Sequence, residues 1–225
     1  MDQNTPSTPS KMTRPGGNLR RKMIQSAFYL SLFTLAGISF LLVTQHITAE
    51  PIKQAEKQVL LKTIDQILPT TQYNNDLFTD TITVTSPDYL GTTDPVTIYR
   101  ARFNKKPVAV IFKVIATNGY SGNIEIITGI YQDGTLSGVR VLKHRETPGL
   151  GDKIETRKTD WVLGFSGERL QPDQKRYWRV KKDGGHFDQF TGATITPRAI
   201  VKAVKNALDF YQQNGDRLYD STQSN

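Results

Sequence analysis

The chain has 225 residues, no cysteine and a formal net charge of +8. Without cysteine it can form no disulfide, thiol nucleophile or cysteine-ligated iron–sulfur cluster, and its three scattered histidines (His46, His144 and His186) predict no metal site. Nucleic-acid binding is not expected either: residues 1–22 hold five basic and one acidic residue, half of the excess charge, and the remaining charges are interspersed.

Residues 23–45 are predicted to form a transmembrane helix. No Asp, Glu, Lys or Arg lies between Lys22 and Glu50, and an apolar run of this length can cross a bilayer. A cleaved signal peptide is the alternative, but Ile47-Thr48-Ala49 is a poor cleavage site. The basic residues before the span place residues 1–22 in the cytoplasm as a disordered tail. We therefore expect a single-pass protein of the bacterial inner membrane whose main domain, residues 50–215, is periplasmic.

The pattern after the span predicts an α+β domain. Pro51 is expected to open a polar helix that ends at Pro69. Short apolar alternations then predict strands, and Asp133-Gly134 between two of them is typical of a hairpin turn. We expect one antiparallel sheet with flanking helices, including a short helix near Trp161; no Gly-x-Gly-x-x-Gly follows a strand, so a dinucleotide-binding fold is not indicated. The expected strands are 81–84, 96–99, 108–114, 126–131 and 136–142.

A C-terminal helix is predicted from Thr196 as N-cap and Pro197 at the first helical position, followed by an apolar stripe and ending near Gly215. Residues 216–225 are expected to be disordered. The helix is preceded by the small-residue loop Asp188–Thr194, and a helix start of this kind can bind an anion such as phosphate. An ordinary capped helix is the competing interpretation.

Two motifs resemble those of a known family. Asp188-x-x-Thr191-Gly192-Ala193-Thr194 resembles the motif by which FMN-binding domains carry FMN in phosphoester linkage to a threonine. His144-Arg145-Glu146-Thr147-Pro148-Gly149-Leu150-Gly151 resembles a second loop of the same domain, and the typical segments 118–122 and 124–129 precede it. With the N-terminal anchor, the whole chain resembles the G subunit of the Rnf (Rsx) electron transport complex. The C subunit of the sodium-translocating NADH:quinone oxidoreductase shares both motifs.

The resemblance implies roles for individual residues. Thr194 would carry the FMN, which a flavin transferase attaches from FAD, whereas a plain loop threonine is the alternative. Asp188 would be recognised by the transferase or would stabilise the loop, and an ordinary turn residue is the alternative. Glu146 and Thr147 would offer a carboxylate and a hydroxyl to the flavin, although a plain Gly/Pro loop is the competing interpretation. The remaining residues assigned to the cofactor site are Thr191, Gly192, Ala193, Thr196, Gly149, Leu150 and Gly151.

The implied function is electron transfer within a membrane complex that couples redox chemistry to ion movement. The chain would be a tethered carrier, with the other subunits of the complex as partners, and would not be active alone. A component like the C subunit of the quinone reductase, a stand-alone periplasmic flavin reductase and an anchored module without a cofactor are the alternatives. The absence of a nicotinamide-binding motif and of an acid–base pair favours the carrier.

Overall fold

A computed structural model describes residues 16–171 and 176–220 of the chain. The chain divides into two compact units, residues 1–57 and 58–225. The sequence also predicts disorder for residues 1–15 and 221–225, which lie outside the described residues.

Helix α1 spans Gly16–Asp65 and contains Pro51. The disorder predicted for residues 16–22 is therefore wrong: the helix of the apolar segment begins at Gly16, and Leu19, Arg20, Arg21 and Lys22 are good helix formers. The prediction that Pro51 opens a separate helix is also wrong: proline removes one N–H donor, but the chain on both sides remains helical. Within the described residues, Leu19–Asp65 is the one helix long and apolar enough to cross a membrane.

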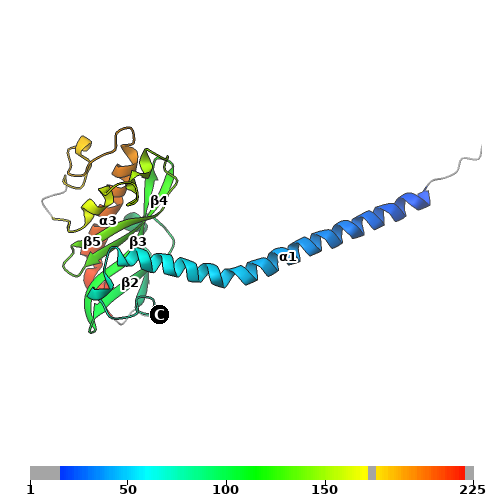
Figure 1. Cartoon of the computed structure of the whole chain (residues 1–225), viewed down its shortest axis with the longest axis horizontal. Helices are drawn as coiled ribbons and strands as arrows, with labels where there is room; N and C mark the ends of the chain where they lie inside the picture. Colours follow the sequence, from blue (N-terminus) through cyan, green and yellow to red (C-terminus); the bar gives the residue numbers. More distant parts are fainter. Residues whose placement is uncertain (1–15, 172–175, 221–225) are drawn as a thin grey trace, which may run out of the picture. The chain divides into compact units, whose positions relative to one another are not determined.

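The second unit contains a five-stranded antiparallel sheet in the order β1-β2-β3-β4-β5, which confirms the predicted α+β class (Figure 1). The Asp133-Gly134 hairpin is confirmed between β4 and β5, where Gly134 has a φ of 84° and the Thr135 amide bonds the Asp133 carboxylate. The strands are β1 Thr81–Val84, β2 Val96–Phe103, β3 Lys106–Gly119, β4 Gly122–Tyr131 and β5 Leu136–Lys143; a short helix, α2 Pro87–Leu90, lies between β1 and β2.

Each face of the sheet is buried in its own apolar cluster. Val110 and Phe112 of β3 belong to the cluster that contains the buried side of helix α3, Ile195–Leu218. Ala109 and Ile111, which alternate with them, belong to the second cluster with Ile64, Ile67 and Leu68. Since both faces are covered, β3 reads as a nearly continuous apolar run in the sequence.

Helix α3 differs from its prediction at both ends. Its N-cap is Thr194, whereas Thr196 lies in the first turn and is fully buried. The helix also continues past Gly215 to Leu218, which is 2 % exposed. The chain beyond is held to β2, because Arg102 donates to the carbonyl of Tyr219 at 2.8 Å and Arg100 to that of Asp220 at 3.0 Å. The prediction that residues 216–225 are disordered is therefore wrong for residues 216–220.

The segment between β5 and α3 contains only short 3₁₀ helices in its described part: η2 Gly151–Ile154, η3 Trp161–Phe165 and η4 Lys181–Asp183. The helix expected near Trp161 is thus η3. Stacked aromatic side chains hold this segment, for example Phe165 against Phe187 with ring centroids 4.6 Å apart. It carries both sequence motifs toward the start of α3.

Candidate functional site

The loop before α3 is a tight turn on a buried anchor. The amide of Ala193 donates to the carbonyl of Phe190 at 3.1 Å, and Gly192 at the third position of the turn has a φ of 81°. Glycine adopts this conformation without the steric cost that other residues incur. The ring of Phe190 is 8 % exposed and lies 5.2 Å from that of Trp161. Thr191 and Gly192 therefore lie exposed in a turn that the buried ring of Phe190 holds in place.

Thr194 lies at the point where this turn becomes helix. It has a φ of −73° and a ψ of −27°, is half-buried, and its hydroxyl makes no cap hydrogen bond. The first turn of α3 contains no acidic residue. In the described structure, the side chain of Thr194 therefore leaves the first amides of α3 without a cap, although the Glu146 carboxylate reaches this turn through the hydroxyl of Thr196. Uncapped amides at the positive end of a helix dipole can accept an anion.

Asp188 has its side chain at the surface. Its carboxylate is 67 % exposed and pairs with the Lys181 ammonium at 2.7 Å. Its carbonyl accepts the indole N–H of Trp161 at 2.8 Å. The backbone at Asp188 is thus fixed by Trp161, while the side chain remains at the surface.

The second motif forms another turn. The carbonyl of Thr147 accepts hydrogen bonds from the amides of Leu150 and Gly151, both at 3.1 Å. Pro148 and Gly149 occupy the centre of the turn, and Gly149 has a φ of 78°, the arrangement that a type II turn requires. Thr147 and Leu150 are exposed.

The structure brings the two motifs together. A Cβ added at Gly192 would lie 3.6 Å from Cδ2 of Leu150, so Leu150 packs over the turn before α3. The hydroxyl of Thr196 donates a short hydrogen bond to Oε2 of Glu146. A Cβ added at Gly151 would lie 2.8 Å from that same oxygen, so glycine is needed where this loop passes the carboxylate.

Glu146 is buried, at 4 % exposure, and both of its carboxylate oxygens are bonded to protein. Oε1 accepts the amide of Ser121 at 3.0 Å, in the turn between β3 and β4. A Cβ added at Gly119 would lie 2.9 Å from Oε1. Glu146 therefore joins three segments: the β3–β4 turn, its own loop and the start of α3. The residue pattern did not identify Ser121 as a partner, although segment 118–122 carried part of the family resemblance.

His144 and Glu155 support the base of the second motif. No role was predicted for His144, although it belongs to that motif, and Glu155 was not identified from the sequence. Nδ1 of His144 accepts the amide of Glu146 at 3.1 Å, so the proton of the neutral ring lies on Nε2, which donates to Glu155 at 2.8 Å. Hydrogen bonds from Arg157 and then from His144 hold the pKa of Glu155 at about 2, against an ordinary 4.5, although burial raises it. Glu155 is thus a charged anchor for this loop at neutral pH.

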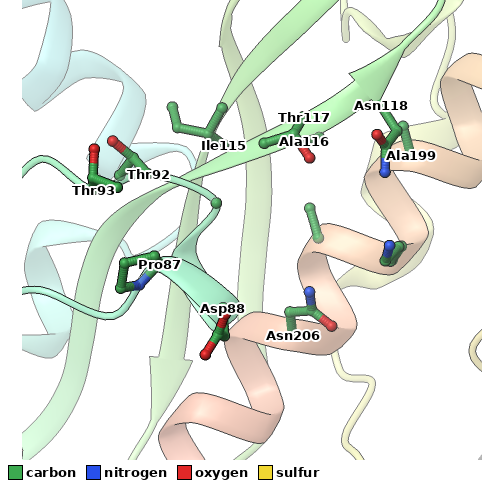
Figure 2. Close-up of a pocket in the computed structure, with 13 residues that line it drawn as sticks. Pro87, Asp88, Thr92, Thr93, Ile115, Ala116, Thr117, Asn118, Ala199 and Asn206 are labelled. Carbon is green, nitrogen blue, oxygen red and sulfur yellow. The ribbon is translucent and has the colours of Figure 1, made fainter.

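A separate groove of about 290 Å³ lies between β3 and α3 (Figure 2). Asn118 and Ala199 lie at one end, and Thr92 and Thr93 at the other. None of the cofactor-site residues expected from the sequence lines it. The groove does adjoin the site, because Asn118 immediately precedes Gly119, which packs against Glu146.

Comparisons with known proteins agree with both motifs. Residues 119–209 match the family model of the FMN-binding domain, and residues 12–67 match that of the RnfG N-terminal region. The chain is 46% identical over 204 residues to the G subunit of the ion-translocating oxidoreductase complex of Pseudoalteromonas atlantica, covering 91% of this chain and 95% of the relative. It is 46% identical over 189 residues to that of Vibrio parahaemolyticus (84% and 89%) and 43% identical over 196 residues to that of Vibrio cholerae (87% and 93%).

Proposed function

Because the chain belongs to the family of G subunits of ion-translocating oxidoreductase complexes, we propose that it is a tethered electron carrier whose FMN is attached to Thr194. It is a membrane protein and a flavin-carrying subunit of such a complex, with the other subunits as its partners. FMN supplies one- and two-electron redox chemistry when bound, while the protein supplies position and electrostatics.

The residues around Thr194 fit a flavin phosphate. The observation that carries the proposal is the Thr194 hydroxyl, which makes no cap hydrogen bond although it lies at an uncapped helix start. A phosphate there would meet the positive end of the α3 dipole. Gly192 keeps the turn free of a side chain next to it, and Asp188, Thr191 and Ala193 complete the loop.

Attachment is a single phosphoryl transfer during maturation. The Oγ1 of Thr194 forms a bond to the flavin-side phosphorus of FAD, and the phosphoanhydride bond to the AMP half breaks. AMP leaves, and the hydroxyl proton passes to a base of the flavin transferase or to water. The transferase binds FAD and magnesium, because this chain has no nucleotide-binding loop of its own. No oxidant or reductant is consumed.

The intact mass of the protein tests this proposal. Full-length chain produced with the flavin transferase should gain the mass of one FMN minus water, and chain produced without it should not. The labelled band should also fluoresce in a denaturing gel, since a covalent flavin survives denaturation. An unlabelled chain in the presence of active transferase and FAD would contradict covalent attachment.

The orientation of the protein is part of the same proposal. Arg20, Arg21 and Lys22 lie at the start of the apolar segment, and no lysine or arginine follows until Lys53. The positive-inside rule then supports a cytoplasmic N-terminus and a periplasmic domain, residues 50–215. Protease added to spheroplasts should digest the domain, and a cytoplasmic marker should survive. Digestion only after lysis would reverse the orientation.

A further inference from the structure

The groove of Figure 2 lies beside an unpaired stretch of strand β3. Strand β2 pairs with β3 only as far as Ile98 and Phe112. Beyond Phe112, β3 continues to Gly119 and pairs with β4 on its other side. In the described structure, residues 113–119 therefore have no strand partner on the β2 side. The backbone donors and acceptors of such an edge can pair with another chain.

The connection between α2 and β2 covers only the first part of this edge. A Cβ added at Gly91 would lie 2.1 Å from the carbonyl oxygen of Ile115, so the backbone of Gly91 lies directly against it. Past Ile115 the edge borders the groove, which Ala116, Thr117 and Asn118 line. The groove therefore coincides with the part of the edge that remains open.

Strand β3 also bulges at this point. It pairs with β4 up to Ala116 and again at Gly119, so the two residues between them, Thr117 and Asn118, lie opposite Asn123 alone. A bulge redirects side chains and is common beside functional sites. The side chains of Thr117 and Asn118 are exposed and line the groove.

The groove is surrounded by polar side chains that lack a partner. They include amide, hydroxyl, carboxylate and ammonium groups, and they come from the α2–β2 region, the end of β3 and helix α3. Within the described residues, none of them makes a side-chain hydrogen bond or an ion pair: Asp88, Thr93, Thr117, Asn118, Lys202 and Asn206. A ligand in the groove could therefore bond to them without displacing an existing contact.

We propose that the groove is a docking site for a short extended segment of another subunit of the complex, which adds to the open edge of β3 as an extra strand. In strand addition, hydrogen bonds between the two main chains provide the affinity. Residues 116–118 span roughly 10 Å at about 3.4 Å per residue, so only a few residues of the partner are held here. The proposal rests on membership of the complex and is independent of FMN attachment.

The lining of the groove suits a peptide of defined chemistry. The side-chain amides of Asn118 and Asn206 both donate and accept, as a peptide group does. Ala199 and Ala203, each 5 % exposed, form a floor that leaves room for small side chains. Lys202 on α3 faces the groove with Asp88 on α2 as the opposite charge, so a segment with one acidic and one basic residue is complementary.

Docking here would hold the partner beside the loops of both motifs. Asn118 immediately precedes Gly119, and a Cβ added at Gly119 would lie 2.9 Å from Oε1 of Glu146. Glu146 bonds Thr196 in the first turn of α3, and Ala199 of the groove follows in the same helix. An electron carrier needs its partner close to these segments, and the groove provides a contact there.

Single cysteines test the proposal, because the chain has none of its own. Thr117→Cys and Asn206→Cys lie in the groove, and Thr97→Cys is the matched control at an exposed β2 residue outside it. Maleimide labelling of each full-length variant is measured by intact mass, in the isolated chain in detergent and in the assembled complex. In the complex, labelling in the groove should be severalfold slower, and labelling at position 97 should not change.

Two further measurements identify the occupant. Hydrogen exchange of residues 113–118 should be slower in the complex than in the isolated chain, because strand addition protects backbone amides. A photo-crosslinker attached at position 206 should join the chain to a segment of another subunit, identified by mass spectrometry. Lys202→Glu should restore much of the labelling of Asn206→Cys in the complex, whereas Lys106→Glu, at an exposed lysine where β3 begins, should not.

Equal labelling rates in the isolated chain and the complex, or equal slowing at all three positions, would overturn the proposal. So would slow labelling without protection of residues 113–118, a crosslink to a second copy of this chain, or protection in the isolated chain that dialysis removes, which would assign the groove to a small molecule. None of these measurements uses the flavin. A chain that lacks the FMN increment would therefore overturn the attachment at Thr194 and leave this proposal standing.

Discussion

The hydroxyl of Thr196 donates a hydrogen bond to the carboxylate of Glu146, fifty residues earlier in the chain. Thr196 is fully buried and Glu146 is 4 % exposed, so water does not compete for this bond. The pair joins the first turn of α3 to the loop that follows β5. It explains how two motifs that are separate in the sequence lie together in the fold.

Removing this hydroxyl should destabilise the domain. Thr196→Val leaves the buried carboxylate without one of its two partners, so the free energy of unfolding should fall by about 1–3 kcal/mol. Thr196→Ser keeps the hydroxyl and should lose less. Urea unfolding of the full-length protein in detergent, followed by tryptophan fluorescence, measures both. A valine variant as stable as the wild type would show that the bond contributes nothing.

Gly151 should not tolerate a side chain. Alanine would place its Cβ 2.8 Å from Oε2 of Glu146 and 2.9 Å from Oγ1 of Thr196, and both residues are buried and cannot move aside freely. We expect Gly151→Ala to lower the free energy of unfolding by about 1–3 kcal/mol. Gly164→Ala is the control, because a Cβ there meets nothing within 4 Å. Equal thermal midpoints for the two variants would contradict this expectation.

The strands and the hairpin of the sheet could be predicted from short stretches of sequence. Alternation of apolar residues identified the strands because each face of the sheet is buried, and Asp133-Gly134 identified a hairpin because its turn needs a positive φ. The family motifs predict Thr194 and Leu150 as cofactor-site residues, and this assignment stays a prediction. In the structure, Leu150 lies against Gly192 in the turn that precedes Thr194.

The sequence-based predictions of the two ends of α3 were wrong, because contacts between residues distant in the sequence determine where this helix begins and ends. Thr194 and Thr196 are both chemically suited to cap a helix, and only the bond to Glu146 assigns Thr196 to the first turn. Gly215 is a typical helix end, but the buried Leu218 and the arginine contacts from β2 extend α3 beyond it. The hydrogen bond from the Ser121 amide to Glu146 likewise could not be predicted from the residues around either position.

Acid should weaken the anchor of the second motif. The pKa of Glu155 is about 2 in the folded protein, below its ordinary 4.5, so its stabilising contribution is present above about pH 4.5 and is lost as the pH falls toward 2. The stability difference between wild type and Glu155→Gln should therefore shrink over that range. Salt should reduce the difference at neutral pH, because Arg157 is 78 % exposed. A pH-independent difference in urea midpoints would contradict the assignment.

Release from the membrane should abolish carrier function while the domain keeps its flavin. Both apolar clusters of the domain lie after residue 57, so a chain cut after Thr48 and exported should fold and be labelled by a transferase in the same compartment. It should not restore electron transfer in cells that lack the full-length protein, because the anchor supplies a high effective concentration beside the partners. Full restoration at normal expression would favour an independent reductase.

The intact mass of four full-length variants, each produced with the flavin transferase, shows whether Thr194 or one of its neighbouring threonines carries the FMN. Thr194→Ala should lack the FMN increment, while Thr194→Ser should retain part of it, since serine keeps the hydroxyl. Thr191→Ala and Thr196→Ser should remain labelled. An undiminished FMN increment on Thr194→Ala would contradict attachment at this residue.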